Sequence, residues 1–232
     1  MFNKMILNIE TSSRKCSVAL SDSGMVCFSL ESENEMDHST KLAPYVERCM
    51  EELKRRELKL DAVAVSMGPG SYTGLRIGLS LAKGLCFGLN IPLIGISTLK
   101  ILTVKAMFSM GDFKENQVFI PMIDARRMEI YTAVYDNSLD PLMDPCALIL
   151  DETSFSDFAS YPVVIVGDGA EKAKGILRIP IEKCISCLPN AIDMTALSEK
   201  AFREKDFIDI AYSTPFYLKN FQATTPKNNI IC

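Results

Sequence analysis

The stretch that decides the fold is Met67-Gly68-Pro69-Gly70-Ser71-Tyr72-Thr73-Gly74-Leu75-Arg76. It follows an apolar run at residues 62–65 and opens a segment, residues 75–89, that is rich in small residues and predicted to be a helix. A strand, a glycine turn and a helix N-terminus together can hold phosphates, because the turn N–H groups and the helix dipole both attract an anion. The stretch therefore predicts a nucleotide-like turn in an α/β fold.

This turn lacks the residues of two familiar phosphate-binding loops. A P-loop places a Lys directly after its last glycine, and here Gly74 is followed by Leu75. A Rossmann loop has a third glycine at the sixth position of its motif, where this chain has Thr73. Gly68 and Gly70 also suit a structural turn with unusual backbone angles, which is the interpretation we favour. An anion site would use the backbone N–H groups of Gly70, Ser71 and Tyr72.

The composition is that of an ordinary globular protein. The chain has 232 residues, of which 48% are hydrophobic and 23% charged. A formal charge of −4 argues against tight, unaided binding of nucleic acid. The sequence contains no apolar run of the roughly 20 residues that a membrane helix needs, and residues 1–9 lack a signal-peptide pattern. The eight cysteines then indicate reduced thiols, so we expect a cytoplasmic protein with no membrane contact.

The sequence offers no metal site. Cys184 and Cys187 form a lone C-x-x-C, and zinc would need a second such pair. His38 is the only histidine and has Leu42 four residues later, so a helix with paired histidine ligands cannot be built. We therefore predict no metal, no metallopeptidase activity, and a place for His38 at the surface or at a helix start.

The first third of the chain predicts strands followed by an amphipathic helix. Strands are expected over residues 5–9, 17–20 and 26–30. The helix is expected to begin at Ser39 or Thr40, with Pro44 in or near its first turn. Its apolar stripe consists of Leu42, Val46, Cys49, Met50 and Leu53.

The chain then repeats its own plan. Residues 6–10 and residues 120–124 each read as a strand ending in a carboxylate, with a second strand following at the same spacing. Residues 63–70 and residues 162–169 each read as a buried strand followed by G-x-G. Two similarities in the same order predict a duplicated α/β unit.

Two such units are the plan of the duplicated fold of actin, sugar kinases and Hsp70, the ASKHA or RNase H-like fold. We predict this fold with a reduced second lobe, in which nucleotide-binding members hold the nucleotide between the lobes. The predicted division is an N-terminal lobe at residues 1–102, a smaller lobe at 103–222 and a flexible tail at 223–232. A last helix is expected over residues 194–205.

The two strand-end carboxylates are candidate ligand contacts. Glu10 could reach a nucleotide-bound metal or cap the turn at residues 11–13, and we favour the cap because no kinase-type D-x-G follows it. Asp124, with Arg126 and Arg127, could form a phosphate-facing turn or an ion pair between lobes, and the sequence leaves these two alternatives open.

The helix after the glycine turn contains regularly spaced small residues. Gly74, Gly78 and Ala82 recur every four residues, as do Gly84 and Gly88. A glycine inside a helix costs about 1 kcal/mol relative to alanine, so four of them need a reason. Rows of small residues allow close backbone approach, either to the sheet or to another helix.

Five segments of the chain, in order and at matching spacing, resemble the bacterial TsaB (YeaZ) family. They are Ile6-Leu7-Asn8-Ile9-Glu10-Thr11-Ser12, residues 68–78, residues 95–99, residues 123–126 and Pro215-Phe216-Tyr217-Leu218-Lys219. The glycine-rich segment is the most specific. The chain departs from the family at Glu10, where Asp is usual, and at Lys219, where Arg is common. Both changes keep the charge, and the longer Glu10 side chain weakens a magnesium role.

The resemblance implies a non-catalytic scaffold and activator for N6-threonylcarbamoylation of adenosine 37 in tRNAs. It implies no catalytic residue and no cofactor of the chain's own, with ATP or ADP only within a complex. The implied partners are a TsaD-type catalytic paralogue, a TsaE-type ATPase and, indirectly, tRNA. Alone, the chain is expected to form a homodimer through the same surface.

In the family, the first two helices form a bundle with the same pair on the catalytic paralogue, which makes the small and apolar residues of both helices candidate contacts. These are Leu42, Val46, Met50, Leu53, Gly74, Leu75, Gly78, Leu79 and Ala82. The alternative is that these residues cover the sheet, so that only part of them faces a partner. The rival function is an ATP-dependent small-molecule kinase of the same fold, which the missing D-x-G and the thin second lobe disfavour.

Overall fold

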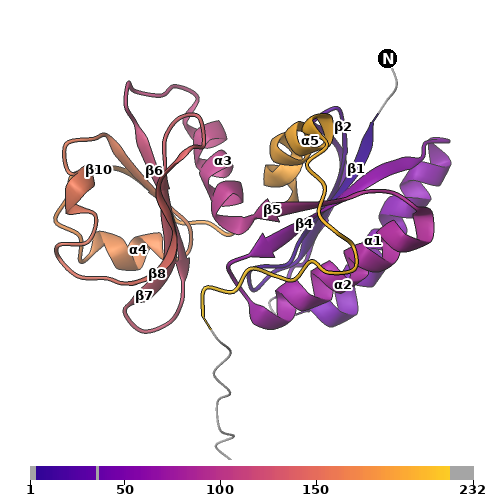
Figure 1. Cartoon of the computed structure of the whole chain (residues 1–232), viewed down its shortest axis with the longest axis horizontal. Coiled ribbons are helices and arrows are strands. Elements are labelled where there is room, and N and C mark those ends of the chain that lie inside the picture. Colours follow the sequence, from indigo (N-terminus) through magenta and orange to yellow (C-terminus); the bar gives the residue numbers. More distant parts are fainter. Residues whose placement is uncertain (1–3, 35–36, 220–232) are drawn as a thin grey trace, which may run out of the picture.

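The computed structural model describes residues 4–34 and 37–219, so the predicted tail at 223–232 lies outside the described residues. It shows two lobes, each built on a five-stranded mixed sheet (Figure 1). The sheet of the first lobe has the order β3-β2-β1-β4-β5. Its strands are β1 (Met5–Glu10), β2 (Ser17–Asp22), β3 (Met25–Glu31), β4 (Leu60–Gly68) and β5 (Leu93–Ser97).

The second sheet repeats the first strand for strand. Its order is β10-β9-β6-β7-β8. In the first lobe β1 pairs antiparallel with β2 and parallel with β4, and in the second β6 pairs antiparallel with β7 and parallel with β9. The predicted duplication is therefore confirmed. The strands are β6 (Val118–Asp124), β7 (Glu129–Tyr135), β8 (Pro141–Ile149), β9 (Val163–Val166) and β10 (Ile181–Ile185).

Two long helices, α1 (His38–Arg55) and α2 (Tyr72–Leu89), cover one face of the first sheet. Alternate side chains of β1 point to opposite faces. Leu7 and Ile9 join the core under these helices, and Ile6 joins the core on the other side. The start of α1 lies within one or two residues of the prediction. Pro44 lies inside the helix, beyond its first turn.

The helix α3 (Thr98–Met110) connects the lobes. It packs against β4 and β5 of the first sheet and against β6, β7 and β9 of the second. The apolar residues of α3 lie on all of its sides, so the helix has no amphipathic stripe. A helix of this kind is stable only when it is buried. None of the described helices combines the length and apolarity that a membrane crossing requires.

The chain returns to the first lobe after β10. The short helix η2 (Ala191–Met194) and α5 (Thr195–Glu204) pack on the face of the first sheet opposite α1 and α2, where Met194 and Ala201 join the core. The structure thus differs from the predicted division, because residues after 190 cover the first sheet. The second lobe is reduced as expected, with η1 (Ser156–Phe158) and the short α4 (Ala170–Lys174) as its own helices.

Candidate functional site

The glycine turn is closed by groups of the chain itself. Ser71 caps α2, because its Oγ accepts the Gly74 N–H at 3.3 Å. The N–H of Ser71 donates to the Ser12 carbonyl at 2.6 Å. Gly70 has a φ of +157°, and a Cβ there would lie less than 3.0 Å from the Ser12 oxygen. The glycines therefore serve a close structural turn, and the Ser71 N–H predicted for an anion is already used.

The first two small residues of α2 face its own lobe. A Cβ added at Gly74 would lie less than 3.0 Å from the Thr11 carbonyl oxygen, and one at Gly78 less than 3.0 Å from Thr11 Oγ1. At Gly84 and Gly88 an added Cβ would meet nothing within 4 Å. The regularly spaced glycines therefore have two roles. One pair lets α2 approach the turn after β1, and the other pair lies open.

Eight of the nine residues predicted to contact a partner are buried in the chain's own core, and Met50 is partly buried. The eight are Leu42, Val46, Leu53, Gly74, Leu75, Gly78, Leu79 and Ala82. A partner cannot reach a buried side chain. The prediction that these eight residues contact a partner is therefore wrong. They cover the sheet, which was the alternative interpretation of the stripe.

A different set of α2 residues is exposed or only partly buried, and we call it the outer face of α2. Phe87 is its largest member and is 83% exposed. Ile77 and Leu81 are half-buried, and the remaining members are exposed. The outer face consists of Thr73, Ile77, Ser80, Leu81, Gly84, Phe87 and Gly88. Such a surface suits the close approach of a second helix.

An apolar pocket lies beside the ends of α1 and α2. It has a volume of about 510 Å³, and Leu58, Leu60 and Leu89 form part of its wall together with Met50. Lys54 and Lys59 also line it. The pocket extends the apolar surface near the C-terminal end of α2, so Met50 is the predicted contact residue that retains access to a partner.

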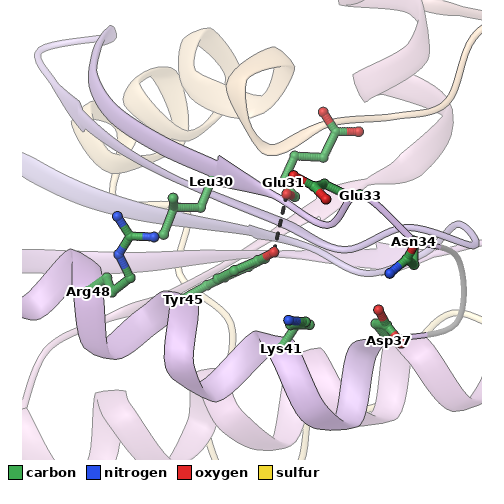
Figure 2. Close-up of a pocket in the computed structure, with 8 residues that line it drawn as sticks. All are labelled: Leu30, Glu31, Glu33, Asn34, Asp37, Lys41, Tyr45 and Arg48. Carbon is green, nitrogen blue, oxygen red and sulfur yellow. Dashed lines mark hydrogen bonds between the residues drawn. The ribbon is translucent and has the colours of Figure 1, made fainter.

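A second pocket, of about 300 Å³, lies between the end of β3 and the start of α1 (Figure 2). Figure 2 shows Tyr45 crossing it, with the hydroxyl donating to the Glu31 carbonyl at 3.2 Å. Its lining carries both signs of charge: Figure 2 shows Glu33 across the pocket from Lys41, and Asp37 on the same side as Lys41. Because these charges are mixed, the pocket does not select an anionic or a cationic ligand.

Glu10 caps the turn that follows β1, as the favoured interpretation predicts. Its Oε1 accepts the Ser12 N–H at 2.5 Å. Burial raises the pKa of Glu10 from 4.5 to about 7, against hydrogen bonds from Ser12 and Ser66 that lower it, and the charge of Asp193 raises it further. Among the described residues, no group of three or more His, Cys, Asp or Glu side chains could hold a metal ion. Glu10 is a buried acid that caps the turn after β1.

Asp124 belongs to an ion pair inside the second lobe. Its Oδ1 accepts from Lys172 Nζ at 2.7 Å and from the Arg126 N–H at 2.7 Å. Partial burial works to raise the pKa of Asp124, but Lys172 and Arg126 lower it overall. Since Lys172 lies on α4, the alternative of an ion pair between lobes is wrong for this residue.

His38 is the first residue of α1, as predicted, but it is buried rather than on the surface. Its Nε2 lies 3.0 Å from the Ser13 carbonyl oxygen. The ring therefore joins the helix start to the turn after β1.

Comparison with known proteins identifies the family of the chain. A family model described as TsaD, tRNA N6-adenosine threonylcarbamoyltransferase, matches residues 32–227. The chain is 30% identical to the tRNA threonylcarbamoyladenosine biosynthesis protein TsaB of Escherichia coli (strain K12), over 93% of this chain and 94% of that protein. The chain belongs to the TsaB family. The TsaB protein of Bacillus subtilis (strain 168) is 28% identical over 94% of this chain and 95% of its own.

The TsaB family assignment agrees with the fold. The solved structure of YeaZ from Pseudomonas aeruginosa matches with a TM-score of 0.80 and 25% identity, covering 93% of this chain and 100% of that one. The chain also resembles part of the tRNA N6-adenosine threonylcarbamoyltransferase of Chromobacterium violaceum, 33% identical over 41% of this chain and 33% of that protein. The predicted family and the duplicated actin-like fold are both confirmed.

Proposed function

We propose that this chain acts in tRNA threonylcarbamoyladenosine biosynthesis as a non-catalytic subunit that binds and activates a TsaD-type catalytic protein in the cytoplasm. Membership of the TsaB family supports the pathway. The partial similarity to a tRNA N6-adenosine threonylcarbamoyltransferase supports the choice of partner. A TsaE-type ATPase would join the same assembly, and tRNA would meet this chain through the complex.

The turns between the lobes support a subunit without chemistry of its own. In nucleotide-binding members of the fold these turns face phosphates. Here the Ser71 N–H and the Glu10 Oε1 are engaged by Ser12. Any ATP or ADP would therefore belong to the complex. The rival kinase function requires the isolated chain to bind Mg-ATP, which calorimetry tests directly.

The observation that carries the proposal is the outer face of α2. Gly84 and Gly88 lie open, at a cost in helix stability of about 1 kcal/mol each relative to alanine. Close packing of another helix against Gly84 and Gly88 would explain why glycine stands at both positions. Aromatic residues are also enriched at protein interfaces, and Phe87 is exposed on this face. Without the partner, two copies would pair through this face as a homodimer.

Gly84→Arg is expected to weaken binding to the TsaD-type paralogue from the same genome by about tenfold or more. The open surroundings of Gly84 let the chain fold with arginine there, while the long side chain holds a second helix away. Isothermal titration calorimetry measures the affinity, and light scattering follows the change from homodimer to heterodimer.

Gly175→Arg is the matched control, because Gly175 is exposed in the second lobe and a Cβ there would meet only the Lys172 carbonyl, at 3.7 Å. Equal affinity of Gly84→Arg and the wild type would contradict the assigned face. A wild-type chain that ignores the paralogue and binds Mg-ATP would instead favour the kinase.

A further inference from the structure

Residues 209–219, which we call the strap, run alongside α2 (Figure 1). Lys83 of α2 donates its Nζ to the carbonyls of Ala211 at 3.2 Å and Ser213 at 2.7 Å. Further along, the Phe216 N–H donates to the Met67 carbonyl at 2.7 Å. The strap is therefore fixed to the helix and to the strand that leads into the glycine turn.

The end of the strap reaches the second lobe. Lys219 forms an ion pair with Glu129 at the start of β7. Gly68, with a φ of +101°, leaves room for the strap, because a Cβ there would lie 2.7 Å from the Phe216 oxygen. These contacts place the strap residue between Phe216 and Leu218, which is Tyr217, against the first turn of α2.

Three side chains contact one another where the strap meets α2. The ring of Tyr217 lies 4.8 Å from the ring of Tyr72, at an interplanar angle of 32°. The guanidinium carbon of Arg76 lies 4.5 Å from the centroid of the same Tyr72 ring. Tyr72 and Arg76 are one helical turn apart, so they share a side of α2. Tyr72 thus links an arginine on the helix to an aromatic residue on the strap.

Arg76 is exposed, and its guanidinium lies against the Tyr72 ring. Within the described part of the chain, its guanidinium forms no ion pair and donates no hydrogen bond. A guanidinium held over an aromatic ring has fewer positions open to it, so a partner's contact costs less conformational entropy. None of the residues that the structure describes therefore occupies the N–H donors of Arg76, and the Tyr72 ring restricts their position.

The surroundings of Arg76 favour one carboxylate over a nucleic-acid backbone. The nearby outer-face residues Thr73, Ile77 and Ser80 carry no charge. Lys83, the next cation along the helix, is engaged by carbonyls of the strap. Nucleic-acid binding depends on several cations acting together. A single planar guanidinium beside a small, partly apolar face instead suits a bidentate pair with Asp or Glu in a protein interface.

We propose that Arg76 anchors a carboxylate of the protein partner, and that Tyr217 is a positioning residue that orients Arg76 through Tyr72. This inference rests on the proposed function, because the partner is the TsaD-type subunit that would meet the outer face of α2. It adds an electrostatic anchor to a surface otherwise described by its small and apolar residues. It also gives the strap a role in recognition.

A double-mutant cycle measured by calorimetry against the TsaD-type paralogue tests the proposal. Arg76→Gln is expected to weaken binding about tenfold or more, and Arg76→Lys to restore little, because an ammonium lacks the planar fork. Tyr217→Leu is expected to weaken binding several-fold in the wild-type background and to have no effect beside Arg76→Gln. Tyr217→Phe is the control, since it keeps the ring and removes a hydroxyl that has no hydrogen-bond partner among the described residues.

Four results would overturn the proposal. Arg76→Gln could bind as tightly as the wild type while Gly84→Arg does not, which removes the anchor and leaves the proposed function standing. Equal losses from Tyr217→Leu in both backgrounds would make Tyr217 merely structural. Unchanged paralogue affinity with weaker binding of purified tRNA by Arg76→Gln would assign the guanidinium to phosphate. If the wild type does not bind the paralogue at all, the proposed function itself fails, and the anchor with it.

Discussion

Gly74→Ala is expected to lower the free energy of unfolding by about 3 kcal/mol, measured by urea denaturation. The added Cβ would lie less than 3.0 Å from the carbonyl oxygen of Thr11. This neighbour is buried backbone in the turn directly after β1, so it cannot rotate away, and overpacking of this kind typically costs 1–3 kcal/mol. The loss reports directly on the close approach of α2 to the turn after β1.

Gly84→Ala is the matched control for this prediction. It changes the same helix in the same way, but its Cβ would meet nothing within 4 Å. Alanine is the better helix former, so this variant is expected to gain about 1 kcal/mol. Similar changes in both variants would show that helix propensity, not packing, explains the glycines. A leucine at Gly78 would likewise test folding, because that position also faces Thr11.

Glu10 is expected to make the stability of the fold fall as the pH rises from about 4.5 to about 7. Burial raises the pKa of Glu10 in the folded chain to about 7, from an ordinary value of 4.5. Between these values the unfolded chain releases the proton and the folded chain keeps it, so rising pH favours unfolding. The difference, at 1.36 kcal/mol for each pH unit, amounts to about 3 kcal/mol.

The measurement is a series of urea denaturations across this pH range for the wild type and Glu10→Gln. Glutamine keeps an oxygen for the Ser12 N–H and does not titrate, so it loses the pH dependence that Glu10 contributes. The contribution of Asp168, whose pKa burial also raises, is common to both proteins. Asp193 interacts with the charge of Glu10, so part of the measured difference includes that interaction. A difference that stays constant from pH 4.5 to pH 7 would refute the prediction.

The sequence predicts those elements that a pattern of neighbouring residues is enough to identify. The stripe of α1, the glycine turn before α2 and the carboxylate-ended strands β1 and β6 are all recovered, and their repetition fixes the duplicated fold. Several elements escape this reasoning, among them α3 and β8. The helix α3 is apolar on every side because it lies between two sheets, and β8 contains Pro141 and Pro145, which an edge strand tolerates.

The sequence predicts less of the candidate site than of the fold. An amphipathic pattern identifies an apolar face but not what covers it, so buried residues such as Leu75 and Leu79 resemble partner contacts in the sequence. The turn cap by Glu10 is predictable because its partner, Ser12, is two residues away. The contact among Arg76, Tyr72 and Tyr217 is not, because it joins a helix to a strap from the far end of the chain.

The return of the chain to its first sheet sets an order of assembly during synthesis. The strands of the second sheet all lie within residues 118–185, so the second lobe is in effect an insertion into the first. One face of the first sheet, with Ile6 and Ile94, is partly covered by Ile101 of α3, and its cover is completed only once Met194 and the residues after it have been made. Because chains are synthesised from the N-terminus, the inserted lobe can finish folding while the older lobe is still incomplete.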